Sequence, residues 1–292
     1  MTGPRAGHLA MLLFSLLVAG SFALGSLAAN EITSSALNAV RFWIATLIIG
    51  AAAFATGGVT RAAFDAPWRY IGLAVFFTTY FVLMFEGLKT APPVSAAAVF
   101  TLTPILTAGF AWLLLRQVLT PRMAFALLIG ALGAVWVIFR ADVAAILRFE
   151  VGPGEMVYFW GCAAHAVYTP LVRKLNRGET AVVFSFGVLL AGSGLLTVWG
   201  WGDLVATDWM ALPGIVWITI LYTAVFASAA TFVLLQFATL RLPSSKVMAY
   251  TYLTPSWVIV WELALGGTPP PVLVLAGLLL TVTALVLLLR DE

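Results

Sequence analysis

The chain has 292 residues, of which 62% are hydrophobic and only 9% charged, with a formal net charge of +3. Because so few polar side chains cannot cover a water-soluble globule of this length, the composition predicts an all-α integral membrane protein. The Lys and Arg residues are spread along the chain and do not form one basic patch, which argues against nucleic acid as a partner.

Ten apolar windows are each long enough to cross ~30 Å of hydrocarbon as a helix. Their apolar runs are continuous and do not alternate, so they do not fit the strands of a membrane β-barrel. Short breaks rich in Gly and Pro separate them. The windows are approximately 9–29, 33–56, 68–88, 92–115, 122–140, 154–173, 180–200, 211–235, 243–265 and 270–290.

The distribution of basic residues predicts that both termini are cytoplasmic. With the N-terminus inside, 11 of the 15 Lys and Arg residues fall in cytoplasmic segments. Only Lys89, Arg140 and Arg148 fall outside, and Arg41 lies within the second window. Such an excess of inner positive charge is the usual orientation signal. The inner residues are Arg5, Arg61, Arg69, Arg116, Arg122, Arg173, Lys174, Arg177, Arg241, Lys246 and Arg290.

Two Thr-Pro pairs, Thr103-Pro104 and Thr254-Pro255, lie about half the chain apart, each preceded at the same distance by another proline. The match predicts two five-helix repeats, in residues 1–148 and 149–292. Because five is odd, the second repeat enters the bilayer inverted, and equivalent residues are related by an axis in the membrane plane.

These features resemble a known family. The residues that carry the resemblance are Arg41-Phe42, the run EGLKTAPPVSAAAVFTLTP (86–104), its partner (238–255), and the helix with Gly130 and Gly133. The chain resembles the drug/metabolite transporter superfamily in its ten-helix EamA-type branch, and it is most similar to YddG-type exporters of aromatic amino acids. The resemblance implies alternating access around a midplane cavity, export of small metabolites, and residence in a bacterial inner membrane.

One feature departs from the family pattern. The family commonly has a Glu after the long helix of each half, and here Arg116-Gln117 and Gly266-Gly267 occupy those places. Any role attached to that Glu is therefore not transferred to this chain.

The two prolines are expected to break their helices near the bilayer midplane. Since proline has no N–H, Pro104 and Pro255 should deprive the carbonyls of Phe100 and Thr251 of their helical donors. In hydrocarbon such carbonyls need another partner or a water-filled cavity. A substrate site is one reading, because repeat-built transporters bind substrate at this depth. A structural kink, with its carbonyls satisfied by neighbouring groups, is the other.

Other residues at this depth complete the predicted site. His165 is the ionisable candidate, with a neutral imidazole that hydrogen-bonds across helices as the alternative. Tyr250, Thr254, Trp257 and Trp261 recur on one helix face and predict an aromatic cavity wall, unless that face meets lipid. The predicted substrate-binding residues are Tyr80, Phe100, Thr103, Pro104, Trp160, His165, Tyr222, Tyr250, Thr254, Pro255 and Trp257.

Three charged residues lie inside the windows, towards the outer third. Arg41 is expected to contact a substrate carboxylate or to pair structurally with Glu86 or Glu262, and Glu86 has the further option of pairing with Lys89. We expect no metal site and no cofactor, because no second His, Cys or carboxylate shares the depth of His165.

The sequence thus predicts an exporter of small amphipathic metabolites, above all amino acids with large apolar or aromatic side chains. No acidic residue falls at the midplane, so we expect a facilitator in which His165 carries no coupled proton. A proton-coupled exporter of drugs or organic cations is the alternative. An intramembrane serine protease is a remote one, because residues 191–194 read Ala-Gly-Ser-Gly and lack the first glycine of its motif. Membrane lipid is an expected partner, and the choice between monomer and homodimer stays open.

Overall fold

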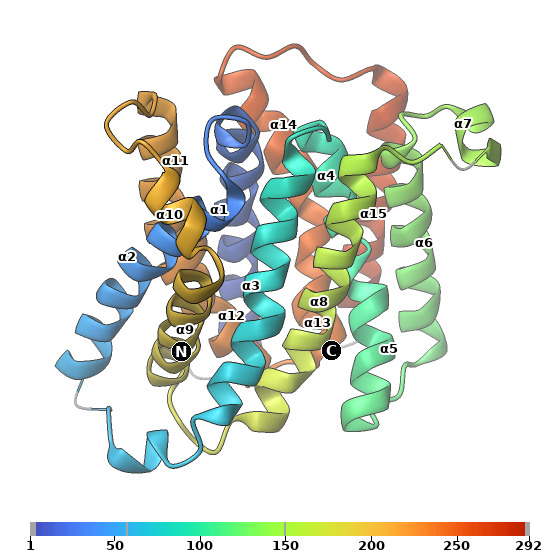
Figure 1. Ribbon diagram of the computed structural model, residues 1–292. Coiled ribbons are helices and arrows are strands. Elements are labelled where there is room, and N and C mark those ends of the chain that lie inside the picture. The colour runs from blue at the N-terminus through green and yellow to red at the C-terminus, as the bar shows by residue number, and fades with distance from the viewer. Residues whose placement is uncertain (1–3, 57, 149, 290–292) are drawn as a thin grey trace.

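The computed structural model describes residues 4–56, 58–148 and 150–289, and within them it contains helices and no strands (Figure 1). The long helices run up and down the molecule as one bundle, joined by connections at its two ends. In the first half they are α1 (Pro4–Ala28), α2 (Ser34–Ala55), α3 (Trp68–Leu88), α4 (Pro93–Phe100), α5 (Thr103–Leu115) and α6 (Pro121–Ile138).

The second half has a similar order. It comprises α8 (Pro153–Leu175), α9 (Ala181–Trp199), α11 (Gly214–Ala224), the π-helix η2 (Val225–Ala230), α12 (Thr231–Thr239), α13 (Ser244–Ala249), the 3₁₀-helix η3 (Tyr250–Leu253), α14 (Thr254–Ala264) and α15 (Val272–Leu289). Three short helices lie in connections: η1 (Arg61–Phe64), α7 (Val143–Arg148) and α10 (Trp201–Ala206).

Eight helical segments among the described residues are long and apolar enough to cross a membrane. They correspond to eight of the ten predicted windows. The window 154–173 forms the long helix α8, which is not among these eight segments and carries Glu155 near its start and Arg173 and Lys174 at its end. The window 243–265 is divided into α13, η3 and α14. Eight such segments indicate a multi-pass membrane protein. The total of ten membrane-spanning helices remains a prediction.

Threonine and proline define several helix starts. Thr33, Thr120 and Thr180 each accept a hydrogen bond from the backbone N–H three residues later, at 3.4, 3.2 and 3.3 Å. These hydroxyls satisfy N–H groups that have no partner within the helix. Pro121 and Pro153 occupy first-turn positions, where a missing N–H costs nothing. The local sequence therefore fixes where these helices begin.

Both Thr-Pro pairs interrupt their helices as predicted. The carbonyl of Phe100 accepts a hydrogen bond from the Thr103 hydroxyl, and the carbonyl of Thr251 accepts one from the Thr254 N–H. Of the two alternatives for these carbonyls, a protein donor and a water-filled cavity, the structure shows a protein donor for both. A donor three residues along the chain replaces the one that proline removes, so each break satisfies itself locally.

A third interruption has no proline. Residues Val225–Ala230 form a π-helix between α11 and α12, so the helical turn widens there. Nothing in the sequence Val-Phe-Ala-Ser-Ala-Ala signals such a turn. It lies against α1 and α2, which brings its backbone into the centre of the bundle.

The two halves pack closely against each other. α1 contacts α12 and α14, while α8 contacts α3 and α5, and α6 packs along α15. At this last crossing a Cβ on Gly133 would lie 2.6 Å from the Gly277 oxygen, and a Cβ on Gly277 would lie 2.8 Å from the Gly133 oxygen. Glycine at both positions is what allows the backbones to approach so closely.

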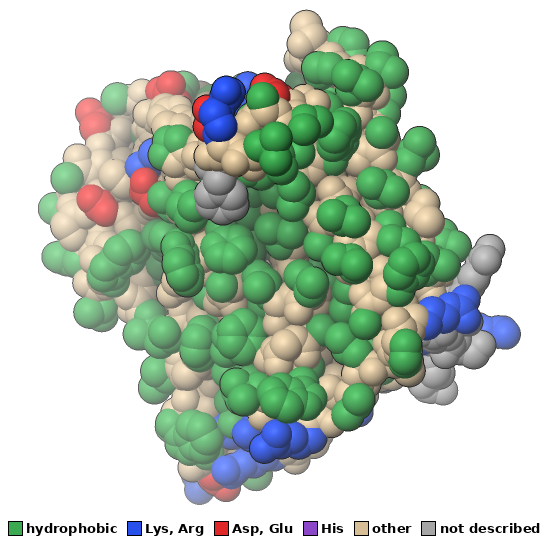
Figure 2. Space-filling model, turned by 90° about the vertical axis from the view of Figure 1, so that its right-hand side faces the viewer, with side chains coloured by type: hydrophobic (Ala, Val, Ile, Leu, Met, Phe, Trp, Pro, Cys, Tyr) green, Lys and Arg blue, Asp and Glu red, His purple; other side chains and the backbone are tan. Residues whose placement is uncertain are grey.

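The visible surface has an apolar middle and charged ends. In Figure 2 hydrophobic side chains cover the middle, Lys and Arg gather chiefly at the lower end with a smaller group at the top, and Asp and Glu gather chiefly at the upper end. The lower end carries the α5–α6, α8–α9 and α12–α13 connections (Figure 1). Arg290, counted above among the inner charges, lies outside the described residues.

Candidate functional site

Aromatic side chains from four helices meet around His165 in the middle of the bundle. The ring of His165 lies 4.5 Å from that of Tyr80, and Phe77 lies 4.4 Å from Tyr168 and 4.1 Å from Phe232. These spacings are those of favourable aromatic pairs. The aromatic cluster, as we call it, comprises Phe77, Tyr80 and Phe81 of α3, Phe100 of α4, Tyr158, His165 and Tyr168 of α8, and Phe232 of α12.

Polar groups are embedded in this cluster. The Tyr158 hydroxyl donates to the Tyr80 hydroxyl over 3.2 Å, and the side-chain amide of Gln236 donates to the Tyr168 hydroxyl over 2.8 Å. The Nδ1 atom of His165 and the Oε1 atom of Gln236 have no hydrogen-bond partner among the described residues. Buried polar atoms are rarely left unpaired, so these two point to a polar ligand or water.

The cluster borders a small cavity. Its volume is ≈ 10 Å³, and its walls include Tyr80, Phe81 and His165 together with Ala227 and Thr231 from the second half. A cavity of this size holds about one water molecule. The cavity is therefore too small to hold a metabolite in this structure.

The structure brings three of the predicted site residues together. Tyr80, Phe100 and His165 are almost fully buried, and their rings contact one another. Thr103 and Pro104 lie three and four residues after Phe100 and are also buried. The first Thr-Pro break therefore lies beside the aromatic cluster.

The residues of the second break have different surroundings. Thr254 and Pro255 are buried, and η3 and α14 pack along α1. The hydroxyl of Tyr250 lies 2.9 Å from His8 Nδ1, near the start of α1. The Thr254 hydroxyl and the indole N–H of half-buried Trp257 have no hydrogen-bond partner among the described residues.

Two further predicted residues lie away from the cluster. Trp160 is 63% exposed on the outer surface of α8, so its prediction as a cavity residue is wrong. Tyr222 sits between α11 and α1, where its hydroxyl donates to the Leu17 carbonyl over 3.0 Å. Trp43 and Trp217 are also exposed, at 41% and 39%.

Arg41 is fully buried on α2 and has no carboxylate partner among the described residues. Its side chain donates to the Ser228 hydroxyl at 2.7 Å, the Ala227 carbonyl at 3.0 Å and the Asn38 side-chain oxygen at 3.3 Å. Its guanidinium also lies 3.8 Å from the centre of the Phe81 ring. The predicted structural pair with Glu86 or Glu262 is therefore not formed.

Glu86 is instead engaged at the upper end of α3. Its carboxylate accepts from the Ser34 hydroxyl at 2.6 Å and forms an ion pair with Lys89 at 2.8 Å. The pairing with Lys89 that the spacing allowed is thus present. The half-buried carboxylate of Glu262 forms no ion pair with a described residue.

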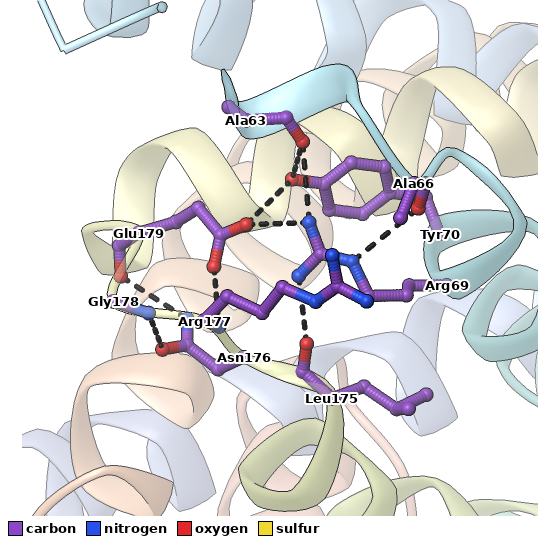
Figure 3. Close-up of polar contacts among 9 residues, drawn as sticks. All are labelled: Ala63, Ala66, Arg69, Tyr70, Leu175, Asn176, Arg177, Gly178 and Glu179. Atoms are coloured by element: carbon purple, nitrogen blue, oxygen red, sulfur yellow. Dashed lines mark hydrogen bonds and ion pairs between the residues drawn. The ribbon is translucent and has the colours of Figure 1, made fainter.

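A buried ion pair lies at the lower end of α3 (Figure 3). Arg69, whose side chain is 1% exposed, pairs with Glu179 over 2.6 Å and also donates to the Leu175 carbonyl at 2.7 Å. Burial alone would raise the pKa of Glu179, but hydrogen bonds from Arg69 and from the Arg177 backbone outweigh it and lower the pKa. This contact ties α3 of the first half to the α8–α9 segment of the second.

Ser193 is not arranged as a protease nucleophile. Its hydroxyl donates to the Leu189 carbonyl at 2.9 Å and lies 2.8 Å from the Thr46 hydroxyl, in the contact between α9 and α2. No histidine is among its hydrogen-bond partners in the described part of the chain. The group that a serine protease uses as a base is thus absent from this position.

Comparison with known proteins identifies the family. The model of the EamA-like transporter family matches residues 5–139 and again residues 152–290. The chain belongs to the EamA-like transporter family. This EamA-like protein is 24% identical over 277 residues to the uncharacterized transporter YyaM of Bacillus subtilis (strain 168), covering 94% of this chain and 90% of that one. A crystal structure with 22% identity superposes with a TM-score of 0.73, over 97% of this chain and 94% of the other, and shows the same fold.

Proposed function

We propose that this EamA-like transporter exports small amphipathic metabolites, above all amino acids with large apolar or aromatic side chains. The observation that carries the proposal is the small cavity beside the aromatic cluster, which is lined by aromatic rings and by His165, whose buried Nδ1 atom is unpaired among the described residues. Aromatic faces suit an apolar or aromatic side chain, and orphaned polar atoms suit the charged groups of an amino acid.

The proposed substrate site is smaller than the set of residues that the sequence suggested. It contains Tyr80, Phe100 and His165, with Thr103-Pro104 beside them. We assign to Thr254-Pro255, Tyr250, Tyr222 and Trp257 a place along α1, where they contribute when the helices separate. Trp160 has no part in it, because its side chain faces outward.

The proposed architecture is ten membrane helices in two inverted repeats, residues 1–148 and 149–292, with both termini in the cytoplasm of a bacterium. The packing supports this arrangement, because α1 contacts α12 and α14 just as α8 contacts α3 and α5, the equivalent elements of the other half. Basic residues gather at the lower end of Figure 2, which we take as the cytoplasmic end. Cysteines placed at 61 and 177 should then react from the cytoplasm, and cysteines at 31 and 205 from outside.

We further propose that the protein is a facilitator. The aromatic cluster and its cavity contain no carboxylate among the described residues, and the His165 ring is surrounded by aromatic rings. Charging an imidazole in such a place is costly, so the neutral form is favoured. Alternating access around this site then moves substrate down its own gradient.

The test is uptake into proteoliposomes with a panel of phenylalanine, tryptophan, alanine and an organic cation such as ethidium. We expect saturable uptake of the aromatic amino acids without any ion gradient, and slower uptake of alanine. Accumulation of ethidium against its gradient on a pH step, with no uptake of amino acids, would instead establish the proton-coupled alternative.

A further inference from the structure

We propose that Arg41 is the anion-binding group of the site and holds the carboxylate of the transported substrate. The proposal rests on the proposed function and adds the chemical group that the protein recognises. It starts from the charge of Arg41, which is completely buried and has no acidic partner among the described residues. A buried cation of this kind is costly to maintain, and in a membrane protein such a residue commonly marks a ligand pathway.

The guanidinium also has unused hydrogen-bonding capacity. It carries five N–H donors. Three of them are used, one on each nitrogen, by Ser228, Ala227 and Asn38. One N–H on each of the two terminal nitrogens therefore has no partner in the described part of the protein. A carboxylate can accept a charge-assisted hydrogen bond from either of these donors.

The position of Arg41 places it directly behind the cavity wall. Its guanidinium stacks over Phe81 and donates to the carbonyl of Ala227, and both residues line the cavity. A carboxylate that reached Arg41 would leave the rest of an amino acid beside the aromatic cluster. In this proposal the Phe81 ring, which contacts both the cavity and the cation, moves aside so that the carboxylate reaches Arg41.

The π-helix η2 connects Arg41 to the second half of the protein. Arg41 is on α2 of the first half, and two of its three acceptors, Ser228 and Ala227, belong to η2 of the second half. π-helical turns are rare and occur frequently at functional sites. Binding of a carboxylate by Arg41 would compete with these contacts, and it would therefore be felt in both halves of the protein.

The experiment compares phenylalanine with phenethylamine, which lacks the carboxylate but keeps the ring and the ammonium. Competition for phenylalanine uptake in proteoliposomes gives the ratio of the two affinities for wild type, Arg41→Gln and Arg41→Lys. We expect wild type to prefer phenylalanine by about tenfold or more, the size of effect that a hydrogen bond to a charged group produces. Arg41→Gln should abolish this preference, and Arg41→Lys should retain part of it.

The matched control is Arg69→Gln, which also removes a buried arginine but lies outside the site. It should unfold at a lower temperature and keep the wild-type ratio. A wild-type ratio near one would overturn the proposal without any variant, as would an Arg41→Gln protein that transports and keeps the wild-type ratio. If wild type transports other carboxylates but no aromatic amino acid, the proposed substrate class fails, and Arg41 is then judged by the same ratio for that carboxylate and its amide.

Discussion

Replacing Glu179 by Gln removes the negative charge from the ion pair that joins α3 to the α8–α9 segment (Figure 3). In the structure Arg69 donates to Glu179 at 2.6 Å and also to the carbonyls of Leu175, Ala66 and Ala63 at 2.7, 3.3 and 3.3 Å. The guanidinium therefore keeps three acceptors in the variant, and the Gln oxygen is a fourth.

The loss should be that of a charged hydrogen bond. Breaking a buried ion pair outright costs about 3–5 kcal/mol, whereas one hydrogen bond to a charged group contributes about 1.5–3 kcal/mol. Because the remaining acceptors of Arg69 limit the damage, we expect Glu179→Gln to lower the free energy of unfolding by about 1.5–3 kcal/mol. For a chain of this size that is a fall in melting temperature of roughly 5 °C.

The assay is thermal unfolding of the purified protein in detergent, with Glu150→Gln as the matched control. Glu150 also forms an ion pair at 2.7 Å, with Arg148, but the two side chains are 55% and 62% exposed. Exposed pairs contribute about 0–1 kcal/mol, so this control should melt close to wild type. Equal melting temperatures for the two variants would refute the reasoning that burial makes the Arg69–Glu179 pair strong.

The pH dependence gives a second measurement on the same pair. The pKa of Glu179 is lower in the folded protein than its usual value near ~4.3, so its contribution is fully present above that value. It is lost as the pH falls through the lowered pKa. Wild type should therefore lose more stability than Glu179→Gln between about pH 5 and pH 3.

The remaining predictions concern the site and the packing. Tyr80→Ala should raise the KM for phenylalanine several-fold in proteoliposomes, while Trp160→Ala, at a side chain that is 63% exposed, should leave it unchanged. His165→Gln should keep most of the transport rate without an ion gradient. If wild type accumulates substrate when a pH step is imposed and His165→Gln does not, the proposal that the protein is a facilitator is wrong. Gly133→Ala should destabilise the protein by about 1–3 kcal/mol, because its Cβ would lie 2.6 Å from a backbone oxygen of α15. Gly72→Ala, with no atom within 4 Å, should match or slightly exceed the melting temperature of wild type.

The sequence predicted the helical breaks because their cause is local. Proline lacks an N–H wherever it lies, so the interruptions at Thr103-Pro104 and Thr254-Pro255 follow from the residue type alone. At the first break the replacement hydrogen-bond donor could also be predicted from the sequence, because Thr103 lies three residues after Phe100 and its hydroxyl can reach that carbonyl. The π-helix of residues 225–230 had no such signal in the sequence, and its contacts with α1 and α2 come from segments far away in the chain.

The sequence could not predict which side chains point towards the protein interior and which point outward. In a helix that is apolar on every side, lipid-facing and protein-facing positions have similar composition, so Trp160 could not be distinguished from a buried residue. Depth placed Arg41 near Glu86, but the rotation of α2 turns Arg41 towards η2. Gln236 was missed because it lies just beyond the predicted window and contacts Tyr168 only across helices.

The contacts of α3 explain how one helix can link the site to both ends of the molecule. Arg69 lies at its lower end, Tyr80 in the aromatic cluster and Glu86 at its upper end, so the three contacts span about 25 Å of a single helix. The lower contact reaches the α8–α9 segment, and the upper one reaches Ser34 at the start of α2. Both ends of α3 are thus held to other segments, while residues in its middle line the cavity of ≈ 10 Å³. Weakening either contact should therefore lower the melting temperature, because each one fixes an end of the helix that carries Tyr80.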